Sequence, residues 1–249
     1  MGMTTGSLIL QARMGSERLP GKSMVGLAGQ PMIDALMQRL DGINCEKWLA
    51  TSDSGEDDVL AIFAKKHGWK VLRGSKEDVL SRFEQILTSG DSTFCLRVTG
   101  DNPLACPTGL TEMIRKFDDL CQDIDYMSDF DFREYPVGAF AEIFSVPKFL
   151  SSIKDIPVEE PWHFAHVTSW MRKCSRISPL QLPSIFVPRA SWRWTIDYPE
   201  DLEFISQLIQ FIGKSWNSST YPEIVRILDS NPQLLAINFD LKQKPIELG

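Results

Sequence analysis

The first 120 residues alternate short apolar runs with amphipathic segments, and this rhythm constrains the fold more than any other feature. The run 7–11 (SLILQ) predicts a buried strand, and further strands are expected at 47–51, 70–73 and 93–101. Each strand is followed by a segment with helical spacing of apolar residues. Regular alternation of this kind predicts a parallel sheet with helices on both faces.

Four helices are expected between and after these strands, each with a buried apolar face. One spans 31–40 and buries Ile33, Leu36, Met37 and Leu40; one spans 56–66 and buries Val59, Ile62 and Phe63; one spans 75–87, starts with a Ser–Asp capping pair and buries Val79, Phe83 and Ile86; and one is marked by Leu110, Met113, Ile114 and Phe117.

The rhythm breaks after about residue 125. A helix is expected within 159–173, a proline-broken strand within 177–197, and helices at 199–212 and from 220, where Thr220 and Glu223 have capping-box spacing. No convincing linker interrupts the chain. We therefore predict one domain, 1–249, with an inserted subregion at roughly 126–190.

Composition excludes several classes of protein. The chain has 249 residues and a net charge of −7, so nucleic-acid binding through a basic surface is not expected. Five scattered cysteines without a Cys-x-x-Cys pair predict neither a disulfide framework nor a zinc site, and favour a cytoplasmic protein. The apolar stretch near the start is too short for a signal peptide or a membrane span.

The segment 11–23 (QARMGSERLPGKS) follows the first strand and combines glycines with basic residues. It is not a P-loop, because five residues separate Gly15 and Gly21, and the following Gly26, Gly29 and Pro31 cannot open a helix. We interpret it as a phosphate-binding loop of another fold.

Two more polar segments fall at expected strand ends, one at Asp101 and one at Asp197. Ligands of open parallel sheets bind at the carboxyl ends of the strands. Two carboxylates beside a cationic loop suit a nucleoside triphosphate with Mg²⁺, because hard oxygens hold Mg²⁺ and basic residues offset charge on a departing pyrophosphate.

Simpler interpretations exist for each segment. Asp197 is also placed to be a helix N-cap, and Asp101 to be a turn residue. Arg13, Arg18 and Lys22 are alternatively solvated loop charges. The occurrence of all three signals together favours a site.

Other candidate groups are weaker. His163 and His166 have the spacing of half a metal site, but no third ligand suggests itself, so amphipathic or satisfied histidines are the better interpretation. Trp192 and Trp194 are expected to pack in the core or at an interface rather than to stack on bases. Serines of the loop have no His–Asp partners for a hydrolase triad.

The sequence resembles a known family. The segment QARMGSERLPGK is similar to the N-terminal signature of cytidylyltransferases that make CMP-activated sugars: the CMP-KDO synthetases, the acylneuraminate cytidylyltransferases and, most closely, the spore-coat polysaccharide cytidylyltransferase-like group. Similar later motifs follow in the same order, namely LATSDSGEDD (49–58), RGSKEDVLSRF (73–83), RVTGDNPL (97–104) and TIDYPEDLE (195–203).

The resemblance implies a GT-A-like (Rossmann-like) α/β nucleotidyltransferase that uses CTP and Mg²⁺. It places Arg13, Ser16 and Lys22 on the phosphates, and Asp101 and Asp197 on Mg²⁺, with Arg13, Lys22 and both aspartates as the catalytic set. The nucleotide site would also include Gln11, Ala12, Gly15, Arg18, Ser52, Arg73, Asp78, Arg82 and Thr99. Thr99 stands where CMP-KDO synthetases often have Gln.

The acceptor region departs from the group's pattern. The chain has GAFAE (138–142) where the group tends to have Gly-Leu-Asp-Val-Glu, and FAHVT (164–168) where it tends to have Arg-Glu-His-Val-Thr. Glu142 and His166 are kept and are expected to bind the acceptor, whereas Phe140 replaces an acidic residue. The resemblance thus implies a conventional nucleotide half and an altered acceptor half.

The expected activity is transfer of CMP from CTP to a sugar acid or sugar phosphate, with release of pyrophosphate, in the synthesis of surface polysaccharide. The resemblance also implies that the inserted subregion, roughly 126–190, serves acceptor binding and dimerisation. A homodimer is therefore expected, with aromatic contacts from SWRWTI and PWHF. The alternatives are a transferase for another nucleoside triphosphate, a catalytically impaired nucleotide- or glycan-binding relative, and a hydrolase that releases CMP.

Overall fold

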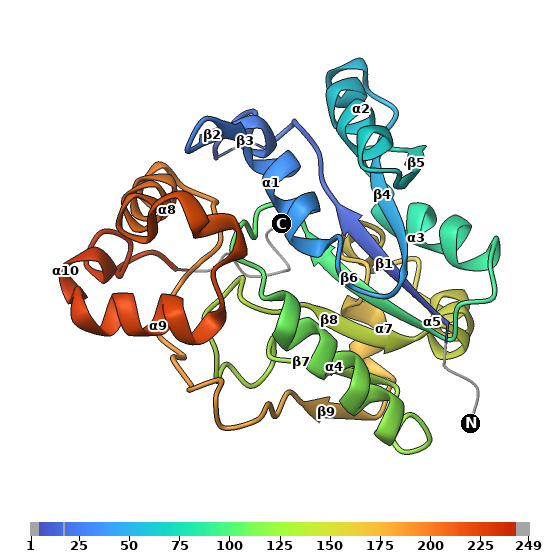
Figure 1. Ribbon diagram of the computed structural model, residues 1–249. Helices are drawn as coiled ribbons and strands as arrows, with labels where there is room; N and C mark the ends of the chain where they lie inside the picture. The colour runs from blue at the N-terminus through green and yellow to red at the C-terminus, as the bar shows by residue number, and fades with distance from the viewer. Residues whose placement is uncertain (1–4, 17, 243–249) are drawn as a thin grey trace.

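A seven-stranded sheet organises the computed structural model, which describes residues 5–16 and 18–242 (Figure 1). The strand order is β5-β4-β1-β6-β8-β7-β9. The strands are β1 (Gly6–Gln11), β4 (Glu46–Ser52), β5 (Lys70–Gly74), β6 (Phe94–Thr99), β7 (Tyr126–Ser128), β8 (Glu142–Ser145) and β9 (Ile177–Pro179), with β2 (Gly26–Leu27) and β3 (Gln30–Pro31) paired separately. Neighbouring strands from β5 to β6 are parallel, β8 is antiparallel to β6 and β7, and β9 is parallel to β7. The expected mostly parallel, mixed α/β sheet is confirmed.

Helices cover both faces because alternate side chains of each strand point to opposite sides. In β1, Leu8 and Leu10 belong to one core cluster and Ile9 to the other. The first core receives side chains from α1 (Met32–Leu40), α2 (Asp58–Lys66), α4 (Pro107–Leu120), α8 (Pro199–Ile212), α9 (Tyr221–Ser230) and α10 (Pro232–Leu235). The second receives them from α3 (Val79–Thr88), α5 (Val146–Ser152) and α7 (Ser169–Lys173), and α6 (Trp162–Ala165) packs against α3. Short 3-10 turns are η1 (Lys22–Met24), η2 (Gly55–Asp57), η3 (Ile153–Asp155) and η4 (Gly213–Ser218). The helices α8, α9 and α10 lie together at one end of the molecule (Figure 1).

Most of the predicted helices are present with the predicted faces. The four apolar residues predicted for α1 are fully buried, and the capping box of α9 is present. Helix α3 begins at Val79 rather than at 75, because Asp78 is its N-cap and accepts a hydrogen bond from the Ser81 N–H.

The predicted face of α2 is confirmed only in part: Val59 and Phe63 pack against the first core, but Ile62 does not. Ile62 is 64% exposed, whereas Leu60, Ala61 and Ala64 are buried. The helix begins at Asp58 after the η2 turn. Its two alanines are buried, although the prediction rested on the large apolar residues alone.

The segment 126–190 is not set apart from the rest of the molecule, since it supplies β7, β8 and β9 to the same sheet. Its role as an inserted acceptor and dimerisation subregion stays a prediction. The single helix predicted within 159–173 is wrong: α6 and α7 are separated at His166–Thr168, where buried Val167 is drawn into the second core. The strand predicted after 177 is limited to β9 and an isolated bridge between Val137 and Arg193.

All five cysteines are free thiols. Within residues 5–16 and 18–242, each helix is too short or too polar to cross a membrane.

Candidate active site

The candidate site lies where the carboxyl ends of β1 and β6 meet. These strands are parallel neighbours, and the chain continues from β1 to β4 on one side in the strand order and from β6 to β7 on the other. This reversal of the strand order makes the edge a topological switch point. The loops after the two strands touch, since a Cβ at Gly100 would lie 2.7 Å from the Cβ of Ala12. The Ile196 N–H donates to the Asp101 carbonyl at 2.8 Å and brings Asp197 to the same edge.

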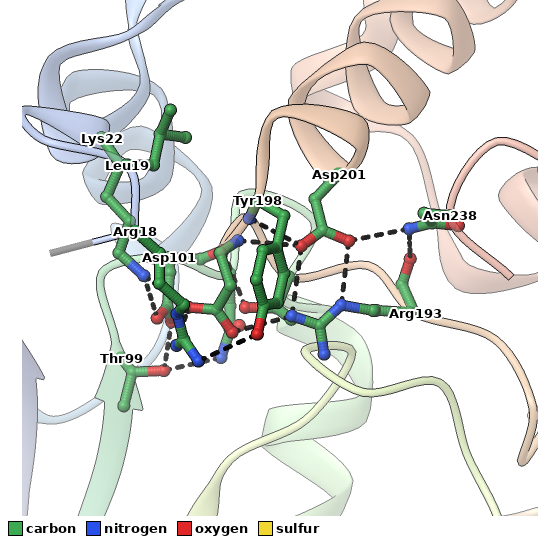
Figure 2. A network of polar contacts seen from close by, with 12 residues as sticks. Arg18, Leu19, Lys22, Thr99, Asp101, Arg193, Tyr198, Asp201 and Asn238 are labelled. Atoms are coloured by element: carbon green, nitrogen blue, oxygen red, sulfur yellow. Dashed lines mark hydrogen bonds and ion pairs between the residues drawn. The ribbon is translucent and has the colours of Figure 1, made fainter. Parts of the chain in front are cut away.

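The carboxylates of Asp101 and Asp197 lie so close together that the ammonium group of Lys22 binds both. The Lys22 Nζ donates to Asp101 Oδ2 at 2.7 Å and to Asp197 Oδ1 at 2.8 Å (Figure 2). The other oxygen of each carboxylate is already engaged: Asp101 Oδ1 accepts from Thr99 Oγ1 at 2.7 Å, and Asp197 Oδ2 pairs with Arg193 at 2.8 Å. Each aspartate therefore presents a single oxygen to the common point.

This donor set fits Mg²⁺ bound together with a substrate. In the described part of the chain, no group of three or more His, Cys, Asp or Glu residues is placed to hold a metal. Mg²⁺ commonly takes one or two protein carboxylates and completes its octahedron with phosphate oxygens and water. Asp101 and Asp197 match that pattern better than a site built from protein ligands alone.

The charges of the pair are balanced by three cations around Asp197. Arg18 lies 3.1 Å from its Oδ1, and Lys22 and Arg193 hold its two oxygens. Burial would raise the pKa of Asp197, but Lys22, Arg18 and Arg193 outweigh this and hold the pKa below its ordinary value. Burial would lower the pKa of Lys22, but Asp101 and Asp197 raise it. Both partners are therefore ionised at neutral pH.

A buried network behind Asp197 fixes its orientation. Asp201, which is fully buried, accepts hydrogen bonds from the backbone N–H groups of Asp197 and Tyr198, from Arg193 and from Asn238 (Figure 2). Tyr198, not Asp197, is the N-cap of α8, so the N-cap interpretation of Asp197 is wrong. Sequence reasoning missed the roles of Arg193 and Asp201; the signal was the acidic residue in the first helical turn, four residues after Asp197.

A first cavity of about 300 Å³ opens beside the loop that follows β1. Its lining includes most of the residues expected around the nucleotide, namely Gln11, Ala12, Arg13, Ser16, Arg18, Lys22, Arg82 and Thr99, together with Asp101 and Asp197. Arg82 is 1% exposed, and its Nε and Nη1 have no hydrogen-bond partner among the described residues. A buried guanidinium with unpaired N–H groups at a cavity indicates an anionic or carbonyl ligand.

Four of the residues expected at the nucleotide do not line this cavity. The Ser52 hydroxyl donates to Asp57, and Arg73 binds the Ser52 and Ser54 carbonyls and the carboxylate of Asp58. Asp78 caps α3, and Gly15 lies in the loop with its Cβ position 3.6 Å from Lys76. Their contact with a nucleotide stays a prediction.

A second cavity, of about 360 Å³, meets the first at the carboxylate pair. Both cavities are lined by Arg18, Thr99, Asp101, His166 and Asp197. The second also has Glu142 in its wall, so both residues expected to bind the acceptor line it. The Glu142 carboxylate is held by Arg97 and by Thr168 Oγ1, each at 2.6 Å. Arg97 also donates to the side-chain oxygen of Gln11. This oxygen of Gln11, a residue expected at the nucleotide, is therefore bound within the protein.

Phe140, which replaces an acidic residue of the group's pattern, lies in the wall of the second cavity. Its ring stacks on Tyr221 at 5.5 Å and meets Tyr135 edge-on at 5.1 Å. A Cβ at Gly109 would lie 2.2 Å from this ring, so the phenyl group fills the space over α4. This part of the wall is therefore apolar where the group's pattern is acidic.

His163 is a satisfied buried histidine, as the better interpretation predicts. It is 1% exposed and contacts Ser169 Oγ through Nδ1 and Glu160 through Nε2 at 2.7 Å. Trp194 is fully buried in the core, which confirms packing as its role.

Comparisons with known proteins agree with this geometry. The sequence profile of the family described as cytidylyltransferase matches residues 7–222. The spore coat polysaccharide biosynthesis protein SpsF of Bacillus subtilis is 35% identical over 236 residues, which cover 90% of this chain and 94% of SpsF. The 3-deoxy-manno-octulosonate cytidylyltransferase of Escherichia coli is 26% identical over 116 residues, or 45% of this chain and 46% of that protein.

Solved structures share the fold. A cytidylyltransferase from Leptospira borgpetersenii superposes with a TM-score of 0.85 at 22% identity, covering 97% of this chain and all of that one. A CMP:2-keto-3-deoxy-manno-octonic acid synthetase complexed with CTP has a TM-score of 0.59 at 16% identity, covering 84% of this chain and all of that one.

The fold is thus that of the nucleotidyltransferases. Within that class, the chain belongs to the cytidylyltransferase family, because the family profile covers most of its length and a relative of nearly equal extent is 35% identical.

Proposed function

We propose that this protein is a Mg²⁺-dependent CMP-sugar synthetase, which transfers CMP from CTP to a sugar-type acceptor and releases pyrophosphate. The observation that carries the proposal is the meeting of two cavities at Asp101 and Asp197. One cavity has the phosphate-type loop and the unpaired Arg82, and the other has Glu142 and an apolar wall. Two sites that share a carboxylate pair suit the transfer of a group between two substrates.

The first cavity suits a nucleoside triphosphate. Arg13, Arg18, Lys22 and Arg82 bring four cations to its lining, which offset the charge of the triphosphate and the charge that develops on the departing pyrophosphate. Arg82 supplies N–H donors that are already desolvated, so their alignment costs little when the ligand binds.

The second cavity suits the acceptor. An acceptor oxygen there would attack the α-phosphorus; the new P–O bond forms as the bond to the β-phosphate oxygen breaks, and the acceptor's proton is lost. Mg²⁺, when held by Asp101 and Asp197, supplies charge neutralisation and lowers the pKa of a coordinated oxygen. Glu142 is placed to orient sugar hydroxyls, since Arg97 and Thr168 fix its carboxylate.

The biological setting is proposed from the relatives. SpsF acts, by its name, in spore coat polysaccharide biosynthesis, and the E. coli relative is a cytidylyltransferase for 3-deoxy-manno-octulosonate. We propose a role for this chain in surface polysaccharide synthesis, with a sugar acid or a sugar phosphate as acceptor. A cytoplasmic location and a homodimer are part of the same proposal.

The test is thermal stabilisation by CTP, UTP, GTP and ATP, each with and without Mg²⁺, followed by pyrophosphate release across a panel of sugar acids and sugar phosphates. A ligand that binds only the folded state raises the unfolding midpoint. We expect a CTP-selective, Mg²⁺-dependent shift in the wild type and in Asp91→Ala, an exposed control, and its loss in Asp101→Ala.

Other outcomes support the alternatives. Selective stabilisation by UTP, GTP or ATP would make the protein a transferase for another nucleotide. CTP binding without pyrophosphate release from any acceptor would favour the impaired binding protein. Release of CMP in the absence of an acceptor would show a hydrolase.

A further inference from the structure

Asp57 is a buried carboxylate that lies within the motif 49–58 but has no role assigned to it so far. It ends η2, is 1% exposed, and has no ion-pair partner in the described part of the chain. Three donors converge on its Oδ2, from Thr51 Oγ1 and from the N–H and hydroxyl of Ser52, at 2.5 to 3.0 Å. Its Oδ1 accepts the Met14 N–H at 2.7 Å. One oxygen therefore binds the end of β4, and the other binds the loop after β1, 43 residues away.

Met14 is the point around which that loop turns. Its carbonyl accepts the N–H groups of Ser16 at 2.8 Å and of Gly21 at 3.0 Å, and Ser23 Oγ holds the neighbouring Arg13 carbonyl at 3.1 Å. Arg13 and Ser16 in turn line the first cavity. Asp57 holds the N–H of the Arg13–Met14 peptide and Ser23 holds its carbonyl, so the position of the side chains proposed to contact phosphate depends in part on the contact with Asp57.

We propose that Asp57 is a positioning residue that sets the phosphate-binding loop for a triphosphate and thereby gives the site its preference for CTP over CMP. The proposal rests on the proposed function. The charge of Asp57 matters because its four contacts are all donors: they stabilise the carboxylate, which forms no direct ion pair within residues 5–16 and 18–242. The same carboxylate favours the charged form of Arg82, whose pKa is lowered by burial and by Arg13.

Asp57→Asn separates the two halves of this contact. The amide oxygen can keep the three donors of β4, which forces the NH₂ group toward the Met14 N–H, where donor faces donor. The variant should therefore fold and lose the loop contact selectively. Glu56→Gln is the matched control, since it removes the same charge from the neighbouring exposed residue of η2.

The experiment measures the dissociation constants of CTP with Mg²⁺ and of CMP by calorimetry for the wild type, Asp57→Asn and Glu56→Gln, with a thermal unfolding curve for each. We expect the ratio of CTP to CMP affinity to fall by about tenfold in Asp57→Asn and to stay at the wild-type value in Glu56→Gln. A purely structural role would lower the unfolding midpoint and leave the ratio unchanged.

The failures of the two proposals are distinguishable. If the wild type binds CTP no more tightly than CMP, the proposed function fails and this inference fails with it. If the wild type prefers CTP and Asp57→Asn keeps that preference, only the positioning role is overturned. Should Asp57→Asn not fold, Thr51→Val removes one donor that orients the carboxylate; a smaller drop of the ratio supports the role, and a wild-type ratio overturns it.

Discussion

Arg82 and Arg39 are both arginines buried on helices, but their guanidinium groups have opposite surroundings. Arg39 on α1 donates to four carbonyl oxygens, those of Ala105, Trp216, Asn217 and Ser219. Arg82 on α3 has two guanidinium nitrogens without a partner among the described residues. Its side chain has room because Gly74 lacks a Cβ, which would lie 2.9 Å from the Arg82 Cγ. An unpaired buried cation costs stability, which indicates that Arg82 is kept for a ligand.

Replacing Arg82 by Met should therefore keep or raise the stability of the folded protein and lower the affinity of the site for CTP. We expect the free energy of unfolding to stay equal or to rise by about 1 kcal/mol, because a buried guanidinium with unsatisfied N–H groups is replaced by an apolar side chain of similar length. CTP affinity should fall at least about tenfold, because a charged donor is lost. Urea unfolding and calorimetry check the two halves, and a large loss of stability with intact CTP binding would contradict the assignment.

At the scale of the element, Arg39 ties α1 to η4 and to the loop after β6. Burial lowers the pKa of Arg39 to about 10, yet four carbonyls hold the charged form in place. Arg39→Met is expected to lower the free energy of unfolding by about 3 kcal/mol, since buried carbonyls lose their donors, and to leave CTP affinity unchanged. Urea unfolding measures the loss; a variant as stable as Arg82→Met would show that these contacts contribute little.

The N-terminus of α8 is the element that fixes Asp197. Asp201→Asn should lower the free energy of unfolding by about 3 kcal/mol, because Arg193 loses a buried carboxylate partner and one N–H tie to the turn is weakened. Glu200→Gln, an exposed change in the same helical turn, should cost less than about 0.5 kcal/mol. Equal unfolding midpoints in urea for the two variants would contradict the proposed support of Asp197.

Sequence reasoning reached the elements whose pattern is local and missed contacts made across the chain. The apolar stripe of α1 and the capping box of α9 are spacings within one helix, and both are confirmed. The face of α2 was predicted from its largest side chains, but the buried residues of this helix include its two alanines. Asp57 and Arg193 carry no local signature of their roles, because their partners lie up to 45 residues away or depend on how a helix begins.

For the whole molecule, the sheet has two halves with different origins. The parallel half, β5 to β6, comes from the first 100 residues and provides most of the first cavity, where the motifs are contiguous in sequence. The mixed half is assembled from distant segments and provides most of the second cavity. Short motifs therefore predicted residues of the nucleotide half. That Phe140, Glu142 and His166 line one and the same cavity is shown only by the structure.

Stability of the whole molecule should decrease in acid. Burial raises the pKa of Asp34, Asp57 and Asp197, but their partners outweigh it, and Arg176 lowers that of Asp125, so all four lie below the ordinary value of 3.8 in the folded state. The unfolded chain then binds more protons in this range, so stability is fully present above about pH 5 and is lost as pH falls through the folded pKa values. Asp129, whose pKa burial raises, acts in the opposite direction but is one group against four.

Urea unfolding at several pH values between about 3 and 7 measures this dependence, and its slope gives the number of protons taken up on unfolding. We expect a steep loss below about pH 4 and little change above about pH 5 from these carboxylates. Asp57→Asn removes one of the four groups, so its curve should be less steep in acid than that of Glu56→Gln, whose exposed side chain has no such partner among the residues that the structure describes. Equal slopes for the two variants would mean that the Asp57 carboxylate is not stabilised by its four donors, and that the loop it holds is positioned by other contacts.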